Sequence, residues 1–140
     1  MSIIDAVQTF VETYSGIGAN EPVQINQLDN VPDGYSIVPV GGGGVINTFI
    51  NGTEVIEFPF VLQSAKSTMD DPNRLENIAF CEAFTIWMKA QDQAENYPTL
   101  GTGETPIEIE TLGWGFLFEQ GKSGVGVYQI QCRLEYEKRY

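Results

Sequence analysis

The feature that most limits the fold of this chain is a long run, residues 71–95, without a single glycine, although the chain contains 15 glycines. The run begins at Asp71, a residue type that often caps helices, and Pro72 suits the first helical position. It ends before Pro98, which cannot continue a helix. The pattern predicts one helix roughly 35 Å long.

This predicted helix is apolar on two opposite sides. At about 100° per residue, its apolar side chains fall into two separate stripes. A helix that lies on one sheet needs only one such stripe. We expect the other stripe to contact either the N-terminal helix or a neighbouring subunit. One stripe contains Leu75, Ile78, Ala79, Ile86 and Ala90, and the other contains Phe80, Cys81, Phe84, Trp87 and Met88.

The rest of the chain predicts one more helix and several strands. Residues 2–14 carry apolar side chains every three or four positions, with Ser2 and Asp5 spaced as in a capping box. The last predicted strand alternates apolar and polar residues, which is typical of a strand with one buried and one wet face. Its Cys132 falls on the apolar side. The predicted strands span residues 23–28, 35–40, 45–50, 53–62, 106–118 and 125–138.

Two local signals refine the strand assignment. Asn51-Gly52 between two apolar runs predicts a β-hairpin turn. Pro59 within the second arm indicates a sheet edge or a bulge, because proline donates no backbone hydrogen bond. We therefore expect one α+β domain over residues 1–140. It contains an antiparallel or mixed sheet, an N-terminal helix and a long central helix packed on it, and a projecting hairpin.

The charge excludes several classes of function. Seven Lys and Arg oppose 19 Asp and Glu, which gives a net charge of −12, and the chain has no histidine. Such a chain lacks a basic surface for gripping phosphates. Without histidine, Ser-His and Cys-His catalysis and imidazole metal ligands are excluded. The first residues do not read as a signal peptide, so we expect a cytoplasmic protein with Cys81 and Cys132 reduced.

Three motifs are candidates for a functional role, but each also has a purely structural interpretation. The four glycines at residues 41–44 lead into a strand rather than a helix, which favours a loop or a close backbone contact over phosphate binding. Glu108 and Glu110 share one strand face and could form an acid–base pair, although a solvated face explains them better. Trp114, between two glycines, is either a core residue or an interface anchor. No catalytic, metal or cofactor site is predicted.

Four segments together resemble a known family. They are residues 56–62 (IEFPFVL), 77–88 (NIAFCEAFTIWM), 98–101 (PTLG) and 128–136 (YQIQCRLEY). The chain is similar to the small minor capsid proteins of tailed phages and prophages of Gram-positive bacteria, which are related to tail terminator (tail completion) proteins. The similarity extends from about residue 35 to the end of the chain.

The resemblance implies a structural virion protein of the tail or neck, assembled in the host cytoplasm, with no enzymatic activity and no cofactor. Terminators of this kind form a homohexameric ring on the head-proximal end of the tail tube. The ring stops tube polymerisation and joins the tail to the neck of the head. The implied partners are further copies of the chain, the tail tube protein and neck or connector proteins. DNA passes through the lumen without specific binding, and no membrane is involved.

Three groups of residues are candidates for these roles, because a ring needs two different patches on each subunit and an acidic lumen would repel DNA. The predicted subunit interface contains Phe80, Phe84, Trp87, Met88 and Trp114. The predicted contact with the tube or a neighbour contains Phe49, Ile50, Asn51 and Gly52. The acids expected to face the lumen are Asp29, Asp33, Glu54 and Glu57.

Other functions stay open at this point. The nearest are another neck or head-closure connector component and a cap of a headless phage-tail-like particle. A small-ligand binding module or hydrolase belongs to a different class and requires a pocket with convergent polar groups.

Overall fold

Two helices and seven strands make up the part of the chain that this computed structural model describes. The described residues are 2–14, 23–25, 34–41, 43–68, 71–113, 115–120 and 124–140. The helices are α1 (Ile3–Val11) and α2 (Asp71–Gln93). The strands are β1 (Val23–Ile25), β2 (Gly34–Pro39), β3 (Gly44–Thr48), β4 (Glu54–Ser67), β5 (Glu104–Thr111), β6 (Phe116–Gln120) and β7 (Val125–Lys138).

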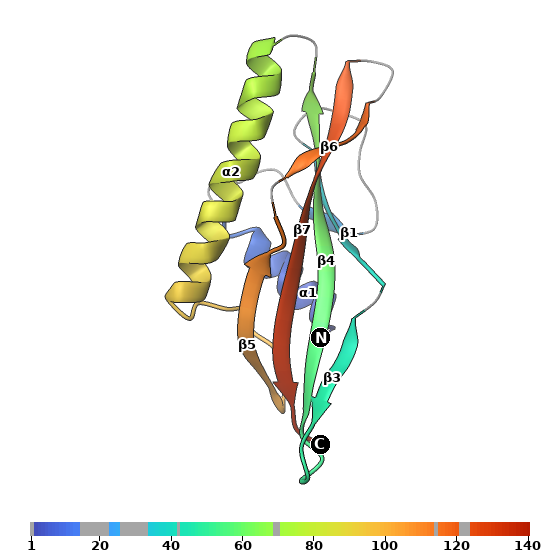
Figure 1. Ribbon diagram of the computed structural model, residues 1–140, viewed down its shortest axis with the longest axis vertical. Helices are drawn as coiled ribbons and strands as arrows, with labels where there is room; N and C mark the ends of the chain where they lie inside the picture. The colour runs from blue at the N-terminus through green and yellow to red at the C-terminus, as the bar shows by residue number, and fades with distance from the viewer. Residues whose placement is uncertain are drawn as a thin grey trace.

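The strands form one mixed sheet around two long central strands. Its main order is β1-β2-β4-β7-β5, with β3 beside β4 and β6 beside β7. β1 and β2 run parallel, and the other described pairs are antiparallel. β4 and β7 pair along their full lengths, from Glu54 opposite Lys138 to Ser67 opposite Val125. The molecule is therefore long and narrow (Figure 1), and the predicted α+β class is confirmed.

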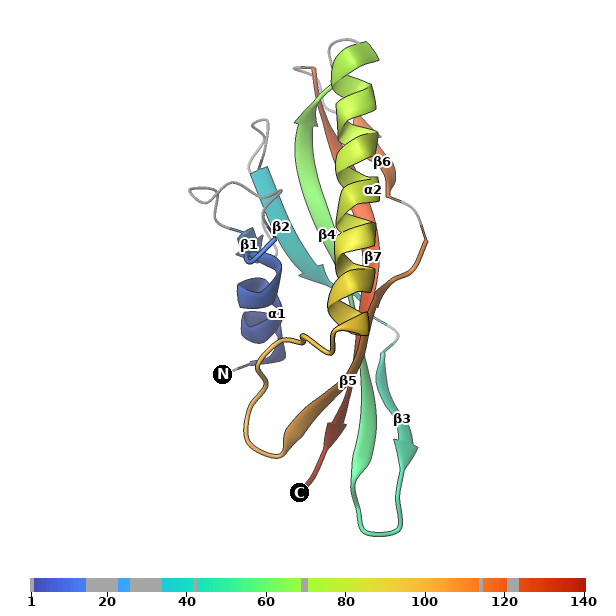
Figure 2. The same ribbon diagram turned by 90° about the vertical axis from the view of Figure 1, so that its left-hand side faces the viewer.

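Both helices pack on the same face of this sheet. α1 contacts β1 and β2, whereas α2 runs alongside β4 and β5 (Figure 2). The predicted capping box is present at the start of α1, where Ser2 and Asp5 bond each other's backbone. Neither described helix is long and apolar enough to cross a bilayer.

The core lies between the helices and the sheet, and it decides which stripe of α2 is buried. Phe84 and Met88 are fully buried, and Phe80 and Trp87 pack partly buried against the same cluster. Tyr14, three residues beyond the end of α1, joins them, with its ring centroid 5.1 Å from that of Trp87.

The prediction that Phe84 and Met88 form a subunit interface is therefore wrong, and Phe80 and Trp87 place most of their rings in the same core. The larger aromatic stripe supplies more apolar area, and both the sheet and α1 cover it. The remaining predicted interface residue, Trp114, lies outside the described residues.

The opposite face of the sheet, called the open face below, carries polar side chains. Along β7, Ile130, Cys132 and Leu134 point into the core, whereas Gln131 and Arg133 point to the open face. The predicted alternation of this strand and the core position of Cys132 are confirmed.

The segment predicted as one strand over residues 106–118 consists of two strands. β5 pairs with β7 up to Thr111 opposite Cys132, and β6 resumes with Phe116 opposite Gln129. Between them the chain leaves the ladder at Gly113, whose φ is +102°. β5 and β6 thus share one edge of β7 in succession.

The Asn51-Gly52 turn is confirmed. Gly52 has a φ of +89°, and the Asn51 side-chain oxygen accepts a hydrogen bond from the Thr53 backbone N–H at 3.0 Å. Pro59, however, lies in a central strand and not at an edge or a bulge. Its carbonyl accepts from the Val40 backbone N–H at 3.0 Å, so its missing N–H faces the gap where β2 gives way to β3. A break in the neighbouring strand tolerates proline as an edge does.

The glycine loop that precedes β3 makes the close backbone contact that the sequence predicted. A Cβ on Gly43 would lie 2.3 Å from Cδ of Pro59 and 2.6 Å from the Glu57 carbonyl oxygen, whereas a Cβ on Gly41 would have no heavy atom within 4 Å. We expect Gly43→Ala to lower the free energy of unfolding by about 1–3 kcal/mol through overpacking. Gly41→Ala is the matched control and should leave it unchanged within error. Urea unfolding of both variants measures this difference, and equal stabilities would contradict the contact.

Candidate assembly surfaces

One helix face stays uncovered by the described chain. The outer stripe of α2, as we call it, contains Leu75, Ile78, Ala79, Ile86 and Ala90, all exposed. Leu75 and Ile86 keep 67% and 69% of their surface exposed. The stripe lies opposite the buried aromatic side of the same helix. Contiguous apolar surface of this kind marks contact sites on soluble proteins. The sequence identified both stripes, and the stripe from which it drew the interface residues is the one that the core buries.

The hairpin of β3 and β4 presents a second apolar surface. Its tip projects beyond the rest of the sheet (Figure 2). Asn51 and Gly52 build the turn, whereas Phe49 and Ile50 expose their side chains, with Ile50 fully in solvent. Of the four residues predicted to make this contact, these two thus provide exposed apolar side chains.

A third exposed apolar group lies on β6, which the candidate residues did not include. Phe116, Leu117 and Phe118 are all exposed at the edge of the sheet. Gly115 brings the start of this strand against α2, because a Cβ there would lie 2.6 Å from Sγ of Cys81. The apolar run after Gly115 was the sequence signal that could have identified this exposed group.

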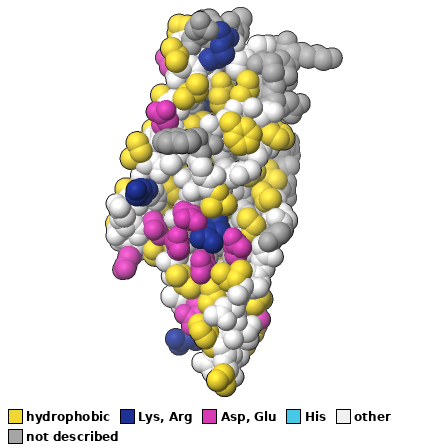
Figure 3. Space-filling model, viewed as in Figure 1, with side chains coloured by type: hydrophobic (Ala, Val, Ile, Leu, Met, Phe, Trp, Pro, Cys, Tyr) yellow, Lys and Arg dark blue, Asp and Glu magenta, His cyan; other side chains and the backbone are white. Residues whose placement is uncertain are grey.

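An acidic cluster surrounds Arg133 in the middle of the open face (Figure 3). The guanidinium nitrogens lie 2.6–3.8 Å from four carboxylates, and Glu110 is the nearest. Partial burial, together with a hydrogen bond and repulsion from Glu110, raises the pKa of Glu108. Four carboxylates against one guanidinium leave an excess of negative charge. The acidic cluster consists of Glu57, Glu108, Glu110 and Glu135.

The two described acids that were expected in a channel, Glu54 and Glu57, do not share one surface. Glu57 belongs to the acidic cluster, and Glu54 accepts a hydrogen bond from the Tyr140 hydroxyl. Because the two residues are three positions apart on β4, they point to opposite faces of the sheet. Asp29 and Asp33 lie outside the described residues.

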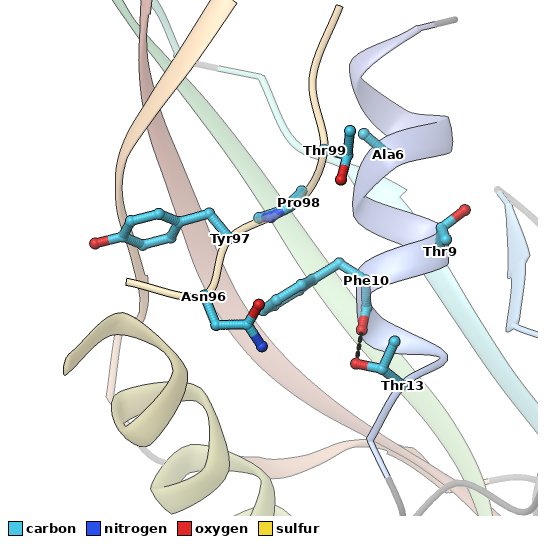
Figure 4. Close-up of a pocket in the computed structure, with 8 residues that line it drawn as sticks. All are labelled: Ala6, Thr9, Phe10, Thr13, Asn96, Tyr97, Pro98 and Thr99. Carbon is cyan, nitrogen blue, oxygen red and sulfur yellow. Dashed lines mark hydrogen bonds between the residues drawn. The ribbon is translucent and has the colours of Figure 1, made fainter. Parts of the chain in front are cut away.

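A cavity of about 280 Å³ lies between α1 and the loop after α2 (Figure 4). Two of its polar side chains are engaged within the chain: the Thr13 hydroxyl donates to the Phe10 carbonyl at 2.6 Å, and Asn96 donates to Gln91. The Tyr97 hydroxyl points away from the cavity and donates to Asp92. Burial and Asp92 raise the pKa of Tyr97 to about 12. Among the described lining residues, no charged side chain faces this cavity, and the polar groups of Thr13, Asn96 and Tyr97 are directed to other parts of the chain.

Comparison of the sequence with protein-family models and with curated proteins gives no match. In the described ranges, no group of three or more Cys, Asp or Glu side chains could hold a metal ion. The cysteines are buried, and burial raises the pKa of Cys81 to about 11 and that of Cys132 further. Since the thiolate is the nucleophile, neither thiol is activated.

Proposed function

We propose that this protein is a structural assembly subunit that forms a homohexameric ring and acts as a tail terminator on a phage tail tube. The outer stripe of α2 is the observation that supports self-assembly. Its large apolar side chains are exposed to solvent, although the other side of the same helix already packs in the core. The terminator role rests on the sequence resemblance.

The proposal assigns separate roles to the exposed surfaces. The outer stripe joins subunits, and the hairpin tip with Phe49 and Ile50 contacts the tube or a neighbour. The ring caps the head-proximal end of the tube and binds neck or connector proteins. Genomic DNA passes through its lumen without specific binding, in keeping with the net charge of −12. The proposal places the protein in the virion, assembled in the host cytoplasm, and includes no enzymatic activity.

Light scattering across a concentration series tests self-assembly. We expect a species with the mass of a hexamer of the 15.5 kDa chain. Adding this species to polymerising tail tube protein of the same particle should shorten the tubes and cap one end in electron micrographs. A chain that stays monomeric at every concentration contradicts the self-assembled ring. A hexamer that leaves tube length unchanged contradicts the terminator role and favours another neck component.

A further inference from the structure

We propose that neighbouring copies join by laying the outer stripe of α2 on the open face of the next copy's sheet, with Lys89 seated on the acidic cluster. The inference rests on the self-association proposed above and specifies which two surfaces meet. The occupant of the open face is thus a second copy of this chain.

The helix side of this contact combines apolar and basic groups. Lys89 follows Ile86 by three positions, so both side chains project from the same face of α2. Lys89 is exposed and forms no hydrogen bond or ion pair with any residue that the structure describes. Ala79 and Ala90 have small side chains that allow another surface to approach closely.

The open face of the sheet has the same order of surfaces, an uncharged region followed by an acidic one. Near the first half of β7, the open face carries uncharged side chains, among them Gln129, Gln131 and Phe116. The acidic cluster follows further along the same strand. A contact between copies of an acidic chain is favoured where a cation of one copy meets carboxylates of the next, because like charges at a contact are strongly unfavourable. Lys89 is a cation that flanks the outer stripe on the side of β5, and the acidic cluster has more carboxylates than its own Arg133 can neutralise.

The spacing of the two surfaces agrees. Ile78 and Lys89 are eleven residues apart, or about 16 Å along the helix. On β7, Gln129 lies four residues from Arg133 and six from Glu135, or about 13 and 20 Å along the strand. With Ile78 beside Gln129 and Phe116, Lys89 therefore falls between Arg133 and Glu135.

The positions of these residues along the long axis of one chain agree with a rotation that relates one copy to the next. Lys89 and Glu110 line one groove between α2 and β5, so they lie at the same level along the molecule. Cys81, one turn after Ile78, lies against Gly115 beside Phe116. A rotation about an axis parallel to α2 and the strands keeps every residue at its height. Such a rotation carries Ile78 to the level of Phe116 and Lys89 to the level of the acidic cluster in the next copy.

The contact is heterologous, because the outer stripe and the open face are different surfaces of one subunit. Each docked copy leaves its second surface free for another, so a closed ring satisfies all contacts. Glu57 then lies at the subunit contact and does not face the lumen.

A charge exchange tests this pairing. Lys89→Glu and Glu108→Lys should each raise the concentration at half-association roughly tenfold or more, because each places like charges together. The double variant restores an opposite pair at every contact, so its association should return toward that of the wild type. Glu108 is the most exposed carboxylate of the cluster, and the fold should therefore tolerate the change. Light scattering and sedimentation measure association, and urea unfolding confirms that each variant is folded.

Glu95→Lys is the matched control, because it makes the same charge change at an exposed position beyond the end of α2. It should leave association unchanged. Single variants that associate like the wild type overturn this interface while the ring itself stands. A double variant no better than the single ones also overturns it. A wild-type chain that never associates overturns both the interface and the ring.

Discussion

Phe84→Ala should lower the free energy of unfolding by about 3–5 kcal/mol, because it opens a cavity in the core. Phe84 is fully buried between α2 and the sheet, and its ring lies 5.4 Å from that of Tyr14 and 5.6 Å from that of Trp87. Urea unfolding at a protein concentration below that of self-association measures the loss without a contribution from assembly.

Ile86→Ala, two positions further along the same helix, is the matched comparison. Ile86 is 69% exposed, so this change should alter monomer stability by no more than about 0.5 kcal/mol. It should instead weaken self-association, which light scattering detects. Equal losses of stability in the two variants would contradict the assignment of the aromatic stripe to the core and the outer stripe to the interface.

Arg133→Gln should produce the second large effect, a loss of about 2 kcal/mol near pH 7.5. Removing one partner of a fully buried ion pair costs about 3–5 kcal/mol, and partial exposure of these carboxylates reduces that figure. The variant keeps Glu57, Glu108, Glu110 and Glu135 together without their shared cation. Chemical unfolding at several pH values measures the effect.

The loss should shrink as the pH falls toward 5, because protonation relieves the repulsion among the carboxylates. In the wild type, Glu108 likewise favours the fold more at lower pH, because its pKa is raised above its ordinary value of 4.5. A raised carboxyl pKa means that the fold binds the proton more tightly than the unfolded chain. Its contribution to stability is therefore fully present below pH 4.5 and is lost as the pH rises through the raised pKa.

Arg139→Gln removes the same charge from an exposed position near the C-terminus. It should change stability little at any pH. A deficit of the Arg133 variant that stays constant between pH 5 and 8 would show that Arg133 acts through packing of its side chain and not through the four carboxylates.

Local interactions explain which parts of the fold followed from the sequence. The sequence placed α2 close to its observed bounds, because the Asp71-Pro72 start signal marks its first residues and the stop predicted before Pro98 lies a few residues beyond its end at Gln93. The alternation along β7 reports directly which side chains share a face. The turn at Asn51-Gly52 needs only the left-handed backbone that Gly52 adopts. Each of these signals lies within a few residues of the structure it predicts.

By itself, the sequence thus determined the helices, the long alternating strand, the hairpin and the presence of two apolar stripes on α2. Tertiary structure alone decided which stripe is buried, because that depends on where the sheet and α1 supply apolar partners. Tertiary structure also brought the acidic cluster together, since Glu57, Glu108 and Arg133 come from three different strands that meet only in the folded sheet. The pairing of β4 with β7 joins residues more than fifty positions apart, and no local pattern encodes such a contact.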